Sequence, residues 1–147
     1  MNVDDQRTGG ENPTPGTRCP TLPEPVMLGA GRTAVCLEVV RHGRDWVLLV
    51  GGGESHAGAV AVHAQAGLDA AAGPVAELVT VPGHKEGPLA AECAAALMPL
   101  TGGTWVAVVG IHQDNATKEE ITAIVANVRR GLALLTDHFT RSPEDGS

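Results

Sequence analysis

The sequence has very few aromatic side chains: its 147 residues include two tryptophans, one phenylalanine and no tyrosine. Proteins that bind single-stranded nucleic acid stack bases on aromatic rings, and proteins that track a duplex cluster lysine and arginine. Here acidic residues outnumber basic residues by 17 to 10, and the formal net charge is −7. We therefore expect no nucleic-acid partner.

Long apolar runs, an export signal and paired cysteines are also missing. No apolar stretch approaches the roughly 20 residues that cross a bilayer, and the first residues lack a basic segment followed by an apolar one. Cys19, Cys36 and Cys93 are far apart, and no C-x-x-C pair is present for a thiolate zinc site or a redox motif. These absences predict a cytoplasmic protein with no membrane partner, whose cysteines are small buried thiols.

Proline and glycine divide the chain into a tail and a domain. Residues 1–25 are rich in both and show no hydrophobic period, so we expect a disordered, proline-rich tail. Residues 141–147 have a similar composition and are expected to form a flexible C-terminus. Between them, residues 26–140 should form a single α/β domain that is large enough to bury its own core.

Hydrophobic patterning within the domain predicts five strands and two helices. The predicted strands cover residues 32–41, 46–50, 58–66, 75–81 and 104–111, although the alanine-rich third segment could also be helical. Pro88 suits the first turn of a helix that ends near Met98. Thr117 and Glu120 form a capping box before an amphipathic helix that extends to Phe139. The fold class is thus α/β in ββββαβα order: a two- or three-layer sandwich with helices packed on a mixed five-stranded sheet.

The order of these elements brings three histidines to one edge of the sheet. If the first four strands form a meander and the following helix crosses over, the second, fourth and fifth strands run in the same direction. His56, His84 and His112 each follow one of these three strands, at the edge where loops commonly carry binding sites. Because neutral imidazole is a common ligand for zinc, copper, iron and nickel, we predict that these histidines hold a divalent metal ion of unknown identity.

Polar residues beside the histidines extend the predicted site. Glu86 and Asp114 each stand two residues beyond a histidine, so either could supply an oxygen ligand or orient an imidazole. Lys85 could meet an anionic ligand as a point charge. The bare backbone of the glycines at 51–53 could approach a phosphate, although such a triplet is usually only a turn, and neither a P-loop nor a dinucleotide-binding pattern is present.

Three segments of the chain resemble the LpdD-like prenylated flavin chaperones, small bacterial proteins encoded with UbiD-type decarboxylases. The segments are GGGESHAGAVAV at 51–62, VPGHKEGPLA at 81–90 and GIHQDNATKEEI at 110–121. The resemblance implies a fold like that of proteasome assembly chaperones, which pair, and hence a homodimer or higher homo-oligomer. It also implies that the protein is not an enzyme: it would bind prenylated FMN, made by a flavin prenyltransferase, and assist maturation of a UbiD-type decarboxylase.

The resemblance matches His56, His84, Lys85, His112, Asp114 and Asn115 to positions of the family's motifs, and the division between metal and cofactor follows from their chemistry. The expected metal ligands are His56, His84 and His112, with the metal bridging them to the flavin phosphate. The expected contacts to prenylated FMN are Gly52, Gly53, Ser55, Lys85, Gln113, Asp114 and Asn115. Trp46 and Trp105 begin their strands and should lie at the far edge, so the flavin ring is expected to rest on aliphatic side chains or between two copies of the chain.

Two other functions fit the same residues. In a small metal-dependent enzyme, the three histidines would hold the ion, and Glu86 or Asp114 would act as general base toward a metal-activated water. In a protein–protein adaptor, the histidines would be incidental and neither ligand would bind. Turnover with metal and no partner protein would identify the enzyme, and binding of neither metal nor flavin would identify the adaptor.

Overall fold

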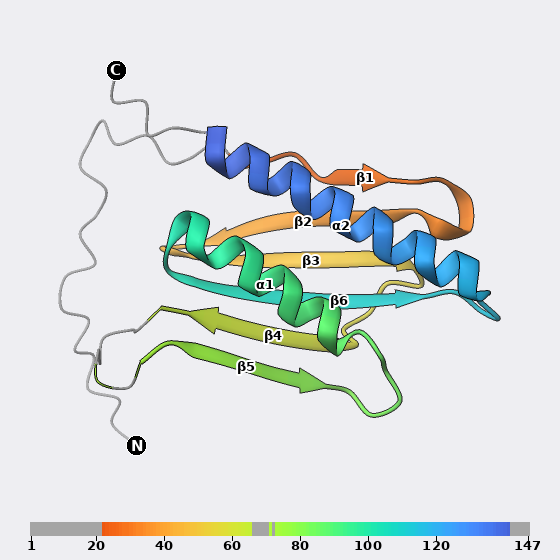
Figure 1. The fold of residues 1–147 in the computed structure, drawn as a ribbon, viewed down its shortest axis with the longest axis horizontal. Helices are drawn as coiled ribbons and strands as arrows, with labels where there is room; N and C mark the ends of the chain where they lie inside the picture. The colour runs from red at the N-terminus through yellow and green to blue at the C-terminus, as the bar shows by residue number, and fades with distance from the viewer. Residues whose placement is uncertain (1–21, 66–70, 72, 142–147) are drawn as a thin grey trace.

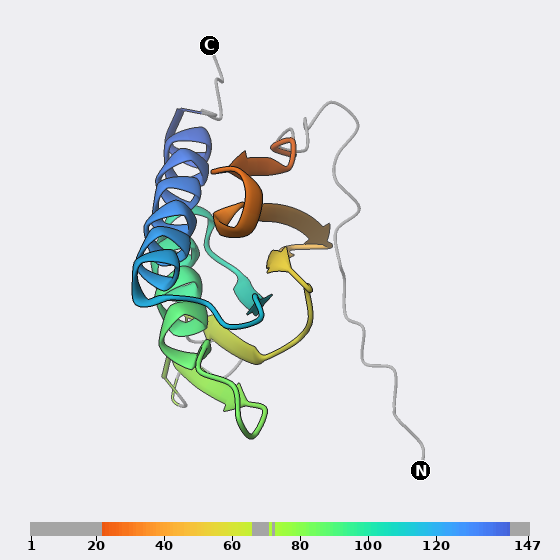
Figure 2. The same cartoon turned by 90° about the vertical axis from the view of Figure 1, so that its right-hand side faces the viewer.

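The chain forms a mixed six-stranded sheet with two helices on one of its faces (Figures 1 and 2). The computed structural model describes residues 22–65, 71 and 73–141. The strands are β1 (Val26–Leu28), β2 (Val35–His42), β3 (Asp45–Gly53), β4 (Ala59–Ala64), β5 (Val75–Thr80) and β6 (Thr104–His112). The helices are α1 (Gly87–Thr101) and α2 (Lys118–Arg141), and the short 3-10 turn η1 (Gly31–Thr33) joins β1 to β2. The predicted α/β class is confirmed, with two layers.

The elements differ from the prediction mainly at their ends. β1 was not predicted, because three residues after a proline-rich segment are too short to show a period. The segment 58–66 contains a strand and not a helix, and α1 continues through Pro99 to Thr101 before Gly102 ends it. The predicted tail and C-terminus lie almost wholly outside the described residues, at 1–21 and 142–147, so the domain limits stay a prediction.

The sheet has three strands that run in the predicted common direction, but its order is not a meander. β3 pairs in parallel with β6, and β6 and β5 each pair antiparallel with β4, so β3, β5 and β6 run the same way. The predicted four-strand meander is wrong, because β6 lies between β3 and β4 in the order β1-β2-β3-β6-β4-β5. The physical reason is that β3 and β6 carry the two continuous apolar runs. Pairing these runs at the centre keeps both away from the edges of the sheet.

The connection from β3 to β4 therefore has to cross β6. Residues 54–58 turn back along the end of β6, and three of their amides donate to β6 carbonyl oxygens at 3.0–3.4 Å. The crossing passes over Gly110, where a Cβ would overlap the carbonyl oxygen of His56. The neighbours Val109 and Ile111 face the helices, so Gly110 and the crossing are on the opposite face. A glycine at this position is what allows the connection to lie against the sheet.

The helices cover the other face and close the hydrophobic core. Ala90, Cys93 and Leu97 of α1 and Val128 and Leu135 of α2 are buried against the sheet. Burial raises the pKa of the Cys93 thiol to about 12, so this cysteine is an inert core residue as predicted. Cys36, on the face without helices, is only half-buried, and partial burial raises its pKa as well.

The three aromatic rings gather on the helix-covered face, far from the predicted site. Trp46 and Trp105 are stacked with ring centroids 5.5 Å apart, and Phe139 packs edge-on against both. The paired tryptophans are seven residue pairs along the β3–β6 ladder from the pair Gly53 and His112, which is about 23 Å. The prediction that the tryptophans lie at the far edge is confirmed. Within the described ranges, neither helix combines the length and apolarity that a membrane crossing needs.

The start of α2 is fixed by the predicted capping box and by an arginine from η1. The Glu120 amide donates to Thr117 Oγ1 and the Thr117 amide donates to Glu120 Oε1, both at 3.1 Å. Arg32 donates from Nε to Glu120 Oε2 and from Nη2 to the carbonyl oxygen of Asp114, both at 2.6 Å. The Arg32 hydrogen bond, followed by that from the Thr117 backbone, holds the pKa of Glu120 below its ordinary value. Arg32 thus ties the loop after β6 and the start of α2 to η1, at the same end of the sheet.

Replacing Gly110 by alanine should destabilise the fold by about 1–3 kcal/mol, because the new methyl group must displace the backbone of the crossing connection. The free energy of unfolding from urea titration measures the effect. Thr104→Val, at the other end of the same strand and on the same face, is the matched control and should stay within about 0.5 kcal/mol of the unmodified protein. Equal stability of the two variants would show that the crossing tolerates a side chain.

Replacing Glu120 by glutamine should destabilise the protein in a pH-dependent way. A carboxyl with a lowered pKa in the folded state stabilises the fold when it is ionised, above its ordinary pKa of 4.5. This contribution is lost as the pH falls through the lowered folded pKa. The difference in urea midpoint between Glu120→Gln and the unmodified protein should therefore be largest near neutral pH and vanish in acid. Glu119→Gln, on the same helical turn but outside the capping box, is the control; a difference independent of pH would contradict the assignment.

Candidate functional site

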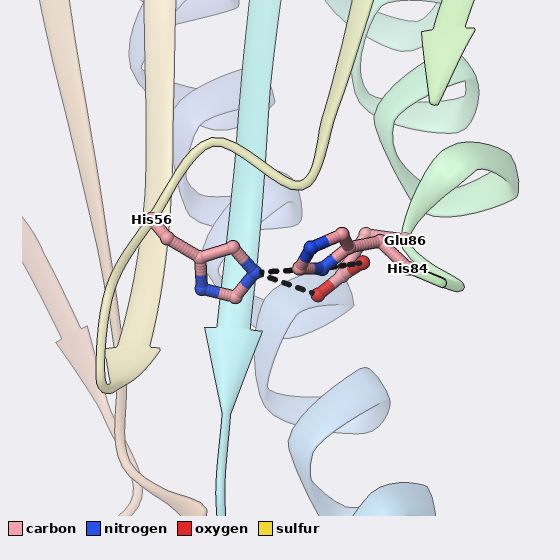
Figure 3. A group of neighbouring side chains, drawn as sticks. All are labelled: His56, His84 and Glu86. Atoms are coloured by element: carbon pink, nitrogen blue, oxygen red, sulfur yellow. Dashed lines mark hydrogen bonds and ion pairs between the residues drawn. The ribbon is translucent and has the colours of Figure 1, made fainter. Parts of the chain in front are cut away.

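Three side chains from two loops converge at the end of the sheet (Figure 3). His56 comes from the crossing connection, and His84 and Glu86 come from the loop between β5 and α1. His56 Nε2 lies 3.1 Å from His84 Nδ1 and 3.4 Å from Glu86 Oε1, and His84 Nδ1 lies 3.7 Å from Glu86 Oε2. All three side chains are partly buried. We call this group the His–Glu cluster.

The spacing of the three donor atoms fits a single metal ion. Ligands held about 2.0–2.1 Å from a tetrahedral ion stand about 3.3–3.4 Å from one another. Here the two nitrogens are 3.1 Å apart, and each nitrogen lies 3.4 or 3.7 Å from a different oxygen of the Glu86 carboxylate. Two imidazole nitrogens and one carboxylate oxygen suit zinc, iron and related divalent ions. Three protein ligands also leave at least one coordination position for an exogenous group. The cluster therefore has both the donors and the geometry to hold a divalent metal.

The backbone around His56 prepares its Nε2 for such a role. His56 Nδ1 lies 2.9 Å from the carbonyl oxygen of Glu54, to which it can only donate. This hydrogen bond selects the tautomer whose Nε2 lone pair points into the cluster. Gly58 lies directly beneath, since a Cβ there would stand 2.7 Å from Glu86 Oε2 and 3.0 Å from His56 Nε2. The crossing connection thus supplies His56 as one donor, fixes its tautomer through the Glu54 carbonyl oxygen, and leaves space at Gly58 for the Glu86 carboxylate and the His56 ring.

His112 lies beside the cluster but has a different immediate partner. Its ring centroid is 6.5 Å from that of His56, in an edge-on arrangement. Its Nε2 is 2.9 Å from Asp114 Oδ1, and both side chains are exposed. The structure thus brings His56 and His84 together with Glu86, whose spacing had marked it as a possible oxygen ligand. The role of His112 as a metal ligand stays a prediction.

The remaining residues predicted to contact a cofactor fall into two groups. Those at the same edge as the cluster are Ser55, Lys85, Gln113, Asp114 and Asn115. Lys85 is exposed, and its backbone amide donates to Glu86 Oε2 at 3.0 Å. Gly52 and Gly53 instead lie within β3, where they pair with the last two residues of β6. The glycines therefore extend the central ladder, and their contact with a phosphate stays a prediction.

Sequence reasoning missed three residues that position the site. Arg32 anchors the loop that carries Asp114, and an arginine in a short turn gives no signal of this. Gly58 and Gly110 make room for the cluster and the crossing. A glycine inside an apolar strand often marks a close approach of another backbone, so Gly110 could have been identified from the sequence.

The surroundings of the cluster are aliphatic. The chain's only aromatic rings are on the opposite face and at the opposite end of the sheet. Val79 and Val81 are exposed next to the loop that carries His84, and the His84 amide donates to the Val81 carbonyl oxygen at 3.0 Å.

Comparison with known proteins connects this site to a family. A search of curated proteins finds no match. A scan of protein families matches residues 29–140 to the prenylated flavin chaperone LpdD-like domain. The matched range includes the whole His–Glu cluster, strands β2 to β6, α1 and nearly all of α2. The chain therefore belongs to the LpdD-like prenylated flavin chaperone family.

Proposed function

We propose that the protein binds prenylated FMN through a divalent metal ion held by His56, His84 and Glu86. In this role it is a non-catalytic cytoplasmic carrier that receives the flavin from a flavin prenyltransferase and passes it to a UbiD-type decarboxylase. The observation that carries the proposal is the convergence of three metal-type donors within the family's domain. His112 and Asp114, at the border of the cluster, would orient the bound group.

Charge favours a phosphate at this site. Two neutral imidazoles and one carboxylate leave a bound divalent ion with one net positive charge, so its open positions attract an anionic oxygen ligand. The exposed Lys85 follows His84 directly and adds a second positive charge at the rim. A flavin phosphate would complete the coordination of the metal and meet Lys85 at the same time.

The valines beside the cluster suit the flavin ring. Val79 and Val81 precede His84 by five and three residues in the sequence, and both side chains are exposed. An isoalloxazine ring placed on them would bury apolar surface without an aromatic partner. The flavin would thus be held by its phosphate and only covered at its ring, which supports a carrier role over that of an enzyme that fixes the ring for chemistry.

Substitutions in the His–Glu cluster should remove metal binding. We expect His56→Ala, His84→Ala and Glu86→Gln each to weaken binding of Zn²⁺ or Mn²⁺ by more than about 100-fold, since loss of a mere supporting group already costs 10–100-fold. Isothermal titration calorimetry with each metal, on protein freed of metal by a chelator, gives the affinities. His42→Ala, an exposed histidine at the other end of the sheet, is the matched control. Unchanged affinity in the three cluster variants would show that the cluster is not a metal site.

Flavin binding should depend on the same three residues. The protein co-expressed with a flavin prenyltransferase is expected to carry a visible flavin absorbance, which the cluster variants lose and a chelator releases. Lys85→Gln should retain the metal but hold the flavin more weakly, because it removes only the rim charge. Bound metal with no flavin, together with hydrolytic turnover, would instead indicate a small metalloenzyme. Binding of neither ligand would indicate an adaptor.

A further inference from the structure

The two edge strands of the sheet differ in how well they are protected from pairing with another strand. Among the described residues, β1 and β5 end the strand order, so each has one side without a neighbouring strand (Figure 1). β1 has three residues and follows Pro23 and Pro25, which have no amide hydrogen to donate. β5 has six residues, all with exposed side chains, and contains neither proline nor lysine. Short strands, proline and lysine are common protections of a sheet edge, and β5 has none of them.

The free hydrogen-bonding groups of β5 belong to alternate residues. The Val81 amide donates to the Gly58 carbonyl oxygen at 2.8 Å, so the backbone at Val81 points toward the β4 side. The N–H and C=O groups of every second residue before it therefore also point toward β4, and those of the residues between them point away from the sheet. The outward-pointing residues are Ala76, Leu78 and Thr80. Their backbone groups form a row of donors and acceptors that a further strand could pair with.

This edge is separate from the surface proposed for the flavin ring. A Cβ at Gly87, the first residue of α1, would stand 2.7 Å from Thr80 Oγ1 and 3.3 Å from a methyl carbon of Leu78, so both side chains are on the face with the helices. Val79 lies between them in the sequence, and its side chain is on the other face. Its backbone groups point toward β4. A strand added beside β5, in the plane of the sheet, would leave the Val79 side chain free.

The charge on β5 indicates the chemistry of a partner strand. Glu77 is the one charged residue of β5, and its side chain is exposed. Its ladder partner on β4 is Val62, which cannot pair with the carboxylate. Opposite charges on neighbouring strands stabilise the pairing, and like charges destabilise it. A strand that places lysine or arginine opposite Glu77 is therefore favoured, and a second copy of β5 offers neither.

We propose that β5 binds an extended segment of a partner protein as an additional strand, with a basic residue opposite Glu77 and apolar side chains beside Leu78. Main-chain hydrogen bonds supply the affinity in this mode of recognition, and the side chains supply the specificity. β5 leads directly into the loop of the His–Glu cluster, since Thr80 is four residues before His84. The partner is the enzyme that receives the flavin, and this identity alone rests on the proposed function.

The chain's own first residues do not fit as the occupant. Leu22 precedes β1 at the opposite edge, five strand spacings or about 24 Å from β5. Arg18 is four residues before Leu22, and four residues span at most about 14 Å. Arg7 could reach farther, but residues 4–10 around it include no apolar side chain. The segment before Leu22 thus lacks a basic residue with apolar neighbours within reach of Glu77.

Strand addition should appear as binding of a short peptide to the full chain. The probe is fluorescein-labelled Val-Thr-Val-Lys-Val-Thr-Val, and fluorescence anisotropy gives its affinity. With lysine opposite Glu77, the valine amides point toward β5 and the threonine amides point away from it. N-methylation of the two inner valines should weaken binding by at least about tenfold, because two hydrogen bonds are lost. N-methylation of the two threonines is the matched control and should change the affinity by less than about threefold.

Substitutions in β5 test the same contact from the side of the chain. Leu78→Pro removes one outward-pointing amide at an edge position, where proline is tolerated, and should weaken peptide binding by about tenfold. Leu78→Ala keeps the amide and is the matched control, with affinity close to that of the unmodified chain. Glu77→Lys should reverse the charge preference: it should bind the peptide with glutamate at the centre several-fold more tightly than the lysine peptide.

Four outcomes would overturn the proposal. They are no binding to the unmodified chain, equal affinity of the two N-methylated peptides, equal affinity of Leu78→Pro and Leu78→Ala, and a mass in solution that Leu78→Pro halves. The last would assign the edge to a second copy, and light scattering after size exclusion measures it. Peptide binding should persist in a chelator, and the metal affinity of Leu78→Pro should equal that of the unmodified chain. Failure of the strand site and failure of the metal site are therefore separate results.

Discussion

The passage of the chain over Gly110 is the contact on which the rest of the structure depends. Because β6 is inserted between β3 and β4, a connection of five residues has to leave one strand, cross the end of its neighbour and enter the next. It can do so only where β6 has no side chain, and it is then fixed by its own amides on β6 carbonyl oxygens. The same few residues place His56 against the loop of His84 and Glu86. The strand order of the sheet and the positions of the metal-type donors thus both depend on the absence of a side chain at Gly110.

The sequence predicts the directions of the strands and the local structure better than it predicts the order of the strands in the sheet. The capping box of Thr117 and Glu120 depends only on residues three apart, and it is present as expected. The common direction of β3, β5 and β6 follows from the number of reversals and the helical crossover, so it holds even though the meander is wrong. The choice of neighbour for β3 is different: its pairing with β6 joins two strands that are far apart in the sequence, and no local pattern shows it.

The same distinction applies to the candidate site. His56 and His84 were predicted to meet because they follow strands of one direction, and the structure brings them to 3.1 Å. Glu86 was named from its spacing, but its preference over His112 as third member depends on side-chain torsions that no pattern in the sequence encodes. Arg32 acts from 82 residues away on the carbonyl oxygen of Asp114, and a contact of that range gives no local signal. The rule that binding residues follow strands of one direction thus locates the region of the site. The conformations of the loops decide which residues form it.

The two faces of the sheet differ in their aromatic content. All three aromatic rings are on the face with the helices, and the face that borders the His–Glu cluster carries valines. Contact between two aromatic systems contributes about 0.5–1.5 kcal/mol beyond the burial of area, or about two- to tenfold in an equilibrium constant. A flavin bound at the cluster as proposed would lack this contribution and would be retained by ligand bonds to the metal ion. For the proposed carrier, the placement of two tryptophans at the far end of the sheet would mean that release of the cargo breaks no aromatic stack, so His56, His84 and Glu86 would control release through the metal ion that they would hold.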